Sequence, residues 1–156
     1  MGMAHLRVQY AGGIFHVWAR RVDRSSLFVD EADYERYLTV LDRTVVACDW
    51  VLLSFCLMPN HVHLLIELRK PNLDKGMQKL HSSYVKWFNA RHDRKGRLFE
   101  HRYGSRPVQD EIYFVTVVEY IESNPVTAKL AATPERWRWS SRGLIAARGC
   151  PDWTRG

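Results

Sequence analysis

The stretch that decides the fold is Trp50-Val-Leu-Leu-Ser-Phe-Cys-Leu-Met-Pro-Asn-His-Val-His-Leu-Leu-Ile-Glu-Leu68. Its first nine residues are almost all apolar, which is typical of a buried strand. Pro59 and Asn60 are a turn signal, and residues 61–68 return as a second strand, so the stretch predicts a β-hairpin. A bilayer takes about 20 apolar residues. The apolar run here is too short to span one, so we expect no membrane segment.

Alternating strand and helix patterns flank this hairpin. A strand at 14–20, where Ile14, His16 and Trp18 share one face, is followed by a helix starting at Asp30. After the hairpin come a helix at about 73–91, a short strand around 106–108, and a helix capped by Asp110 and ended by Pro125. This order predicts an α+β fold of the ferredoxin-like (RRM-like) kind: an antiparallel sheet with helices on one face, leaving the other face for a ligand. The tail is not assigned by pattern.

The composition is that of an ordinary soluble domain. The chain has 156 residues, of which 46% are hydrophobic and 26% charged, so we predict one domain over residues 1–156. Its three cysteines, Cys48, Cys56 and Cys150, are odd in number and lack CxxC spacing. A disulfide framework is therefore not expected, and a reducing compartment fits best. With no signal peptide pattern, the expected location is the cytoplasm.

Positive charge is concentrated in the middle of the chain. Residues 69–106 hold eleven Lys and Arg against three acidic residues, a net +8, so the remainder carries −2 of the total +6. Such a block attracts nucleic-acid backbones by counterion release, although a solvated helix face has the same composition. The candidate DNA contacts are Lys79, Lys86, Arg94, Lys95, Arg97, Arg102 and Arg106. Trp87, Phe88 and Phe99 are candidates for stacking on unpaired bases.

His61-Val62-His63 is the sharpest chemical feature of the sequence. Side chains on a strand alternate, so both imidazoles project from one face and can grip one divalent ion. Two histidines on a half-solvated sheet face give the same pattern, and a further ligand would decide between the two interpretations. His16 is a possible partner of the pair, although core packing is the favoured interpretation for it.

The segment around Tyr120 offers that further ligand. Tyr120 and Asn124 are i and i+4 on a helix and so lie on the same side. The Asn124 amide oxygen, mixed with imidazoles, suits Mg²⁺ or Mn²⁺, and attack of the Tyr120 phenol on a phosphodiester would give a phosphotyrosine ester. The spacing alone equally fits a core-edge tyrosine and an asparagine helix cap. Tyr84 and Tyr103 are rival nucleophiles, with Tyr84 expected in the core and Tyr103 near a DNA backbone.

Taken together, the motifs resemble the HUH single-tyrosine transposases, and more closely the REP-associated tyrosine transposases of the insertion-sequence 200-like family. The resemblance spans a core of about 13–141. Its elements are Phe15-His-Val-Trp-Ala-Arg20, Leu57-Met-Pro-Asn-His-Val-His-Leu-Leu65, Tyr84-Val-Lys-Trp-Phe-Asn89, Gly96-Arg-Leu-Phe-Glu-His-Arg-Tyr-Gly-Ser105, Tyr120-Ile-Glu-Ser-Asn-Pro-Val126 and Trp137-Arg-Trp-Ser-Ser141. The chain departs from it at Lys129, where relatives often have Gly, and at Glu100-His101, where Gln-Gly is common.

The resemblance implies a role for each site residue. His61, His63 and Asn124 would be metal ligands and Tyr120 the nucleophile of an enzyme that cuts and rejoins single-stranded DNA beside a REP-like hairpin, leaving a 5′-phosphotyrosine and a free 3′-hydroxyl. The partner would be hairpin DNA, and the protein a cytoplasmic, nucleoid-associated monomer or homodimer. The alternatives are a domesticated protein that binds hairpin DNA without cutting it, and a phosphodiesterase that uses water.

Overall fold

The computed structural model describes residues 9–148. Strands and helices alternate along this part of the chain nearly as the sequence predicts. The elements are β1 (Ile14–Arg20), α1 (Glu31–Cys48), β2 (Trp50–Met58), β3 (His61–Leu68), α2 (Leu73–Arg91), β4 (Gly104–Val108), α3 (Glu111–Thr127), a 3₁₀ turn (Pro134–Arg136) and α4 (Ser141–Arg148).

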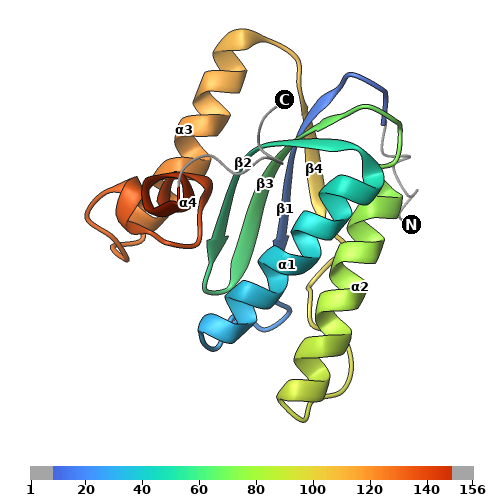
Figure 1. Ribbon diagram of the computed structural model, residues 1–156, viewed down its shortest axis with the longest axis vertical. Coiled ribbons are helices and arrows are strands. Elements are labelled where there is room, and N and C mark those ends of the chain that lie inside the picture. Colours follow the sequence, from blue (N-terminus) through green and yellow to red (C-terminus); the bar gives the residue numbers. More distant parts are fainter. Residues whose placement is uncertain (1–8, 149–156) are drawn as a thin grey trace.

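The four strands form one antiparallel sheet in the order β2-β3-β1-β4 (Figure 1). This order is that of a ferredoxin-like α+β fold and confirms the predicted class. The predicted hairpin is the β2–β3 pair, which places β3 in the middle of the sheet. Pro107 is tolerated in β4 because β4 is an edge strand, where a missing backbone N–H does not break a ladder.

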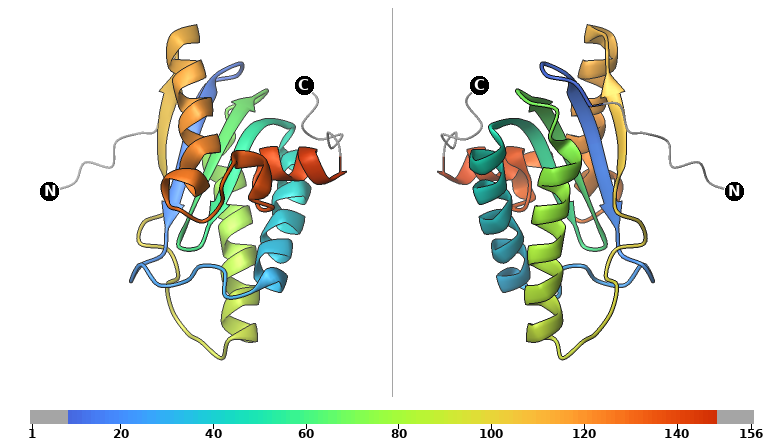
Figure 2. Two further views of the ribbon diagram at one scale, coloured as in Figure 1. Left: turned by 90° about the vertical axis from the view of Figure 1, so that its left-hand side faces the viewer. Right: turned by 90° about the vertical axis from the view of Figure 1, so that its right-hand side faces the viewer.

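The helices are divided between the two faces of the sheet. Figure 2 shows α1 and α2 together on one face and α3 on the other. The expectation that helices cover one face alone is therefore wrong for α3, which packs against β2 and, to a lesser extent, β3. Its buried residues Val117 and Ile121 join a second, smaller apolar cluster with Cys56, Met58, Leu65 and Val108. Helix α3 packs there because β2 and β3 also present apolar side chains on the face opposite α1 and α2.

The main core lies between the sheet and the pair α1 and α2. Strand β3 sends Val62, Leu64 and Ile66 into it, each with no exposed surface. Their neighbours His61 and His63 alternate with them and face the opposite side. Period-two alternation in one strand therefore separates packing residues from polar ones.

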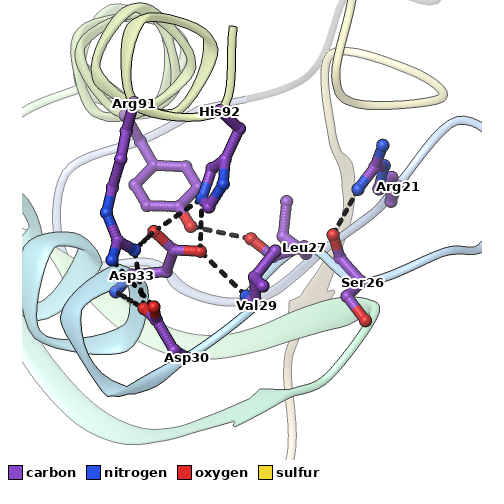
Figure 3. A network of polar contacts seen from close by, with 9 residues as sticks. Arg21, Ser26, Leu27, Val29, Asp30, Asp33, Arg91 and His92 are labelled. Atoms are coloured by element: carbon purple, nitrogen blue, oxygen red, sulfur yellow. Dashed lines mark hydrogen bonds and ion pairs between the residues drawn. The ribbon is translucent and has the colours of Figure 1, made fainter. Parts of the chain in front are cut away.

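A buried carboxylate joins the ends of α1 and α2 (Figure 3). Asp33, with no exposed surface, accepts hydrogen bonds from the Val29 amide at 2.8 Å and from Arg91 at 2.7 Å, and lies 2.9 Å from the His92 ring nitrogen. Asp30, at which the sequence predicted the helix to start, caps α1 by accepting from the Asp33 amide, and Arg91 also binds its carboxylate. Arg91 holds the pKa of Asp30 down to about 2.

Helix α3 continues past Pro125, which was expected to end it. The helix runs to Thr127 and contains Pro125 within its last turn. A proline removes one i to i−4 bond, yet the Ala128 amide still donates to the Asn124 carbonyl at 3.0 Å. Lys129 follows with φ of 60°. This left-handed conformation favours glycine, so the lysine is a less favoured residue at this position.

The unassigned tail closes the exposed edge of β2. The Leu57 amide donates to the Trp139 carbonyl at 2.8 Å, and Trp137 donates its indole N–H to the Leu57 carbonyl at 2.9 Å. Trp139 also stacks on Tyr34, with ring centroids 4.6 Å apart. Trp153 and Cys150 lie outside the described residues, within which Cys48 and Cys56 are free thiols. No helix between residues 9 and 148 is long and apolar enough to cross a membrane.

Candidate metal and nucleophile site

The two histidines of β3 lie side by side on the face opposite the main core. The ring centroids of His61 and His63 are 5.0 Å apart. His63 is buried, with 5% of its surface exposed, and within residues 9–148 its Nε2 has no hydrogen-bond partner. Buried polar atoms without partners are costly and uncommon. The Nε2 atom is therefore a candidate ligand atom.

Helix α3 brings Tyr120 to these histidines. Val117 and Ile121 are buried and anchor the helix on the sheet. Tyr120, the residue before Ile121, therefore lies next to the histidine pair. The Tyr120 ring centroid lies 5.4 Å from that of His63, with the rings nearly perpendicular. The side chain remains 55% exposed, so its hydroxyl is accessible to a ligand from solvent.

Asn124 lies one turn further along the same side of α3. Its Nδ2 donates to the Tyr120 carbonyl at 3.0 Å. The same side chain is near enough to His61 to offset in part the lowering of the His61 pKa by burial and by Arg20, while Nδ1 of His61 lies 2.6 Å from Oδ1 of Asn60. Asn124 therefore lies within α3 and faces β3, and it is not the cap at a helix end that its position before a proline suggested.

His16 reaches the site from the neighbouring strand β1. Its Nε2 lies 3.0 Å from Nδ1 of His63, so it does more than fill the core, which was the favoured interpretation. If Nδ1 of His63 carries the proton in this bond, Nε2 of His63 has a free lone pair. The contact thus orients the His63 ring, and with His16 as the acceptor it leaves Nε2 of His63 able to bind a ligand.

Burial keeps the site histidines neutral. Burial, and then unfavourable electrostatic interaction with His61, His16 and Arg20, lower the pKa of His63 to about 3. Burial and Arg106 lower the pKa of His16 to about 4. A neutral imidazole is the form that coordinates a metal, so the environment favours the binding-competent state at neutral pH.

These residues fit a divalent cation. His63 offers a buried unpaired nitrogen, His61 stands beside it, and the Asn124 amide contacts His61. Across residues 9–148 no group of three His, Cys, Asp or Glu side chains is placed to hold a metal ion. The third candidate of this set is the Asn124 amide, which is outside those four residue types, and two imidazoles with an amide oxygen would suit Mg²⁺ or Mn²⁺.

The predicted DNA-contacting residues do not form one surface. Arg106 pairs across the sheet with His16 and shares its face. Lys79 and Lys86 are exposed on α2, in the layer on the opposite side of the sheet. Arg94 is bound to the Asn89 side chain and the Arg97 carbonyl in the loop after α2, where Lys95 and Arg97 also lie, and Arg102 follows near Asp74. A strand touching all seven would have to pass around the edge of the sheet.

The predicted stacking aromatics are mostly inaccessible. Phe88 and Phe99 are 1% and 5% exposed, and Trp87 is half-buried between Arg36 and Arg91. Trp18, which was not proposed for stacking, is 38% exposed and its ring lies 5.0 Å from that of His16. The sequence did hold a signal for Trp18 as a stacking residue, because the alternation in β1 places it on the same face as His16.

The rival tyrosines are both excluded by burial. Tyr84 has no exposed surface and donates to the Leu27 carbonyl at 2.7 Å. Tyr103, expected near DNA, is 3% exposed and its hydroxyl donates to Asp74. Its position on the chain among arginines misled the prediction, because the ring turns into the core.

A family model places the chain among transposases. The model described as "Transposase IS200 like" matches residues 10–124, a range that includes His61, His63, Tyr120 and Asn124. The chain therefore belongs to the IS200-like transposase family. No curated protein matches it.

Two solved structures share the fold. One is a REP-associated tyrosine transposase bound to a REP hairpin, with a TM-score of 0.80 and 15% identity over 100% of this chain and 92% of that one. The other is a candidate transposase from Deinococcus radiodurans, with a TM-score of 0.52 and 17% identity over 79% of this chain and 95% of that one.

Proposed function

We propose that this protein is an endonuclease and strand transferase that cuts single-stranded DNA beside a hairpin through a phosphotyrosine at Tyr120. The observation that carries the proposal is the convergence of an accessible phenol with a buried histidine pair, one of whose nitrogens has no partner among residues 9–148. Membership of a transposase family supports the reaction class.

The residues of the chain divide the work as follows. The Tyr120 hydroxyl oxygen attacks the phosphorus of a phosphodiester and releases its proton to solvent. A P–O bond to tyrosine forms while the bond from phosphorus to the 3′-oxygen breaks, and that oxygen takes up a proton as a free 3′-hydroxyl. The 5′-phosphotyrosine keeps the ester bond, so attack by another 3′-hydroxyl reverses the step and joins strands.

His61, His63 and Asn124 would hold Mg²⁺ or Mn²⁺. Such an ion, when bound, supplies positive charge to the phosphate oxygens and the leaving oxygen. His16 orients His63 through the 3.0 Å contact, and Asn124 links its position to that of Tyr120. Arg20 and Arg106 add positive charge at the same face, suited to holding the flanking DNA backbone.

The proposed site needs residues of one chain only. Tyr120 contacts the His63 ring of its own chain, which supports a tyrosine acting in cis and a monomer as the sufficient unit. The proposed substrate is single-stranded DNA carrying a palindromic hairpin, because the structural relative is bound to a REP hairpin.

The test is covalent capture. The protein is incubated with hairpin-bearing single-stranded DNA and Mn²⁺, and adducts are resolved by denaturing electrophoresis. We expect an adduct from wild type and from Tyr84→Phe, and none from Tyr120→Phe. An adduct formed in full yield by Tyr120→Phe would refute the assigned nucleophile.

The same assay separates the alternatives. Cleavage without any adduct, retained by Tyr120→Phe, would indicate a water-using phosphodiesterase. Tight hairpin binding with neither adduct nor cleavage under any divalent ion would indicate a binding protein.

A further inference from the structure

A hollow of about 400 Å³ lies between the end of β1 and the segment that leads into β4, on the side of β1 away from the histidine-bearing strand β3. Trp18, Arg20, Glu100 and Gly104 are among the residues that line it. The segment is held against β1, because the Glu100 amide donates to the Arg20 carbonyl at 2.8 Å. Its volume is at the lower end of the range of about 300–1,000 Å³ for small-molecule pockets.

The wall of the hollow is an indole ring with a fixed position. Trp18 packs over Gly104 so closely that a Cβ there would be 2.2 Å from Cε2 of the ring. The ring also contacts His16, at a centroid distance of 5.0 Å and with the two ring planes tilted by 47°. The side chain is nevertheless 38% exposed. An exposed aromatic ring supported from behind is a stacking platform for an unpaired base.

The hollow is adjacent to the phosphate-binding position of the proposed function. Trp18 is the cross-strand partner of His63, and Arg20 is the partner of His61. Paired residues of an antiparallel sheet are about 5 Å apart. A phosphate held at the histidines therefore leaves a neighbouring base of the same strand within reach of Trp18.

We propose that this hollow binds one unpaired nucleobase next to the phosphodiester that is cut, stacked on Trp18, with Arg20 on the adjoining backbone phosphate. The inference rests on the proposed function for the identity of the ligand as single-stranded DNA. It adds the subsite that fixes which phosphodiester lies at Tyr120.

Glu100 gives the subsite a preference among bases. It is half-buried and lines the hollow, where a carboxylate accepts hydrogen bonds from exocyclic amino groups. Bases with an amino group, namely adenine, cytosine and guanine, are therefore favoured over thymine. This is also a position at which the chain departs from the family pattern.

The experiment combines a protein variant with a DNA lesion. Affinity for a hairpin with a single-stranded flank is measured by fluorescence anisotropy at fixed salt, with an abasic site placed at each flank position in turn. We expect Trp18→Ala to weaken binding of the intact flank about 5- to 100-fold. One abasic position should weaken wild type to a similar extent and Trp18→Ala no further.

Two variants control for misfolding and for general loss of aromatic surface. Gly104→Ala keeps the tryptophan but forces the ring to move, and should reproduce the loss at the same flank position. Tyr10→Leu removes an aromatic side chain of equal exposure, 38%, near the opposite end of β1, and should bind as wild type does. Glu100→Gln should reduce discrimination against thymine at that position.

The outcome is independent of the covalent assay. If wild type forms the adduct but no abasic position couples to Trp18, the subsite is refuted while the proposed function stands. If coupling is found without any adduct, the base subsite stands and the cleavage chemistry fails.

Discussion

The two faces of one sheet differ in what they contact. Towards α1 and α2, Val62, Leu64 and Ile66 are completely buried among apolar side chains. Towards α3, the alternate residues His61 and His63 of the same strand lie beside an accessible tyrosine and beneath a helix seated mainly on β2. A strand can thus serve stability with one set of side chains and chemistry with the other.

His63→Ala should have the largest effect on adduct formation. The effect should be confined to the face of the sheet that carries the histidines. The loss of the buried imidazole removes a proposed ligand, and we expect adduct formation to fall on the order of 10³-fold or more. The melting temperature should not fall in proportion, because a buried nitrogen without a partner among residues 9–148 is also removed. Val46→Ala, at a residue of α1 that is 71% exposed, is the control. Undiminished adduct yield in His63→Ala would contradict the assignment.

Leu64→Ala should lower stability and leave activity unchanged, because Leu64 lies on the face of the sheet that packs against α1 and α2. Leu64 has no exposed surface, and removal of a buried leucine side chain costs about 2–5 kcal/mol. Denaturant unfolding should report this loss, while adduct yield per folded molecule stays unchanged. A drop in activity without a drop in stability would show that the two faces are not separable.

His16→Phe tests the link between β1 and the proposed ligand. The ring volume is kept but the 3.0 Å contact with His63 is lost. Groups that orient metal ligands contribute about 10- to 100-fold to affinity, so calorimetric titration with Mn²⁺ should show a loss of that order. His16→Gln, which keeps an acceptor, should recover part of it. Equal affinity in both variants and wild type would leave His16 a packing residue.

The last and smallest effect concerns pH and lies on the packing face. Burial lowers the pKa of His81 from 6.5 to about 4, and its Nε2 lies 3.0 Å from the Tyr37 hydroxyl. The unfolded chain binds the proton more readily between these values, so stability is present above about pH 6.5 and is lost as the pH falls towards 4, by about 2 kcal/mol at pH 5.

The matched variant for this effect is His81→Gln, which keeps a hydrogen-bond partner for Tyr37 but does not titrate. Urea unfolding at pH 7.5 and pH 5 should show a smaller pH-dependent loss in the variant than in wild type. Identical losses would show that His81 is not the source.

Local pattern was sufficient for much of the site. The spacing of His61 and His63 on a strand, and of Tyr120 and Asn124 on a helix, follows from the periods of the two structures. Local pattern failed where tertiary packing decides which way a side chain points. Phe99 and Tyr103 lie among basic residues in the sequence, yet both rings are buried, and Pro125 did not stop α3 because the surrounding turn keeps its other hydrogen bonds.

The amino-acid sequence by itself determined the order of strands and helices, the hairpin, and which side chains share a face, because these depend on neighbours a few residues apart. Only the tertiary structure decided that α3 seats on the second face of the sheet, that Tyr120 meets His63 there, and that the basic residues are divided between layers. Those outcomes depend on which apolar surfaces far apart in the chain bury one another, and no local periodicity encodes that choice.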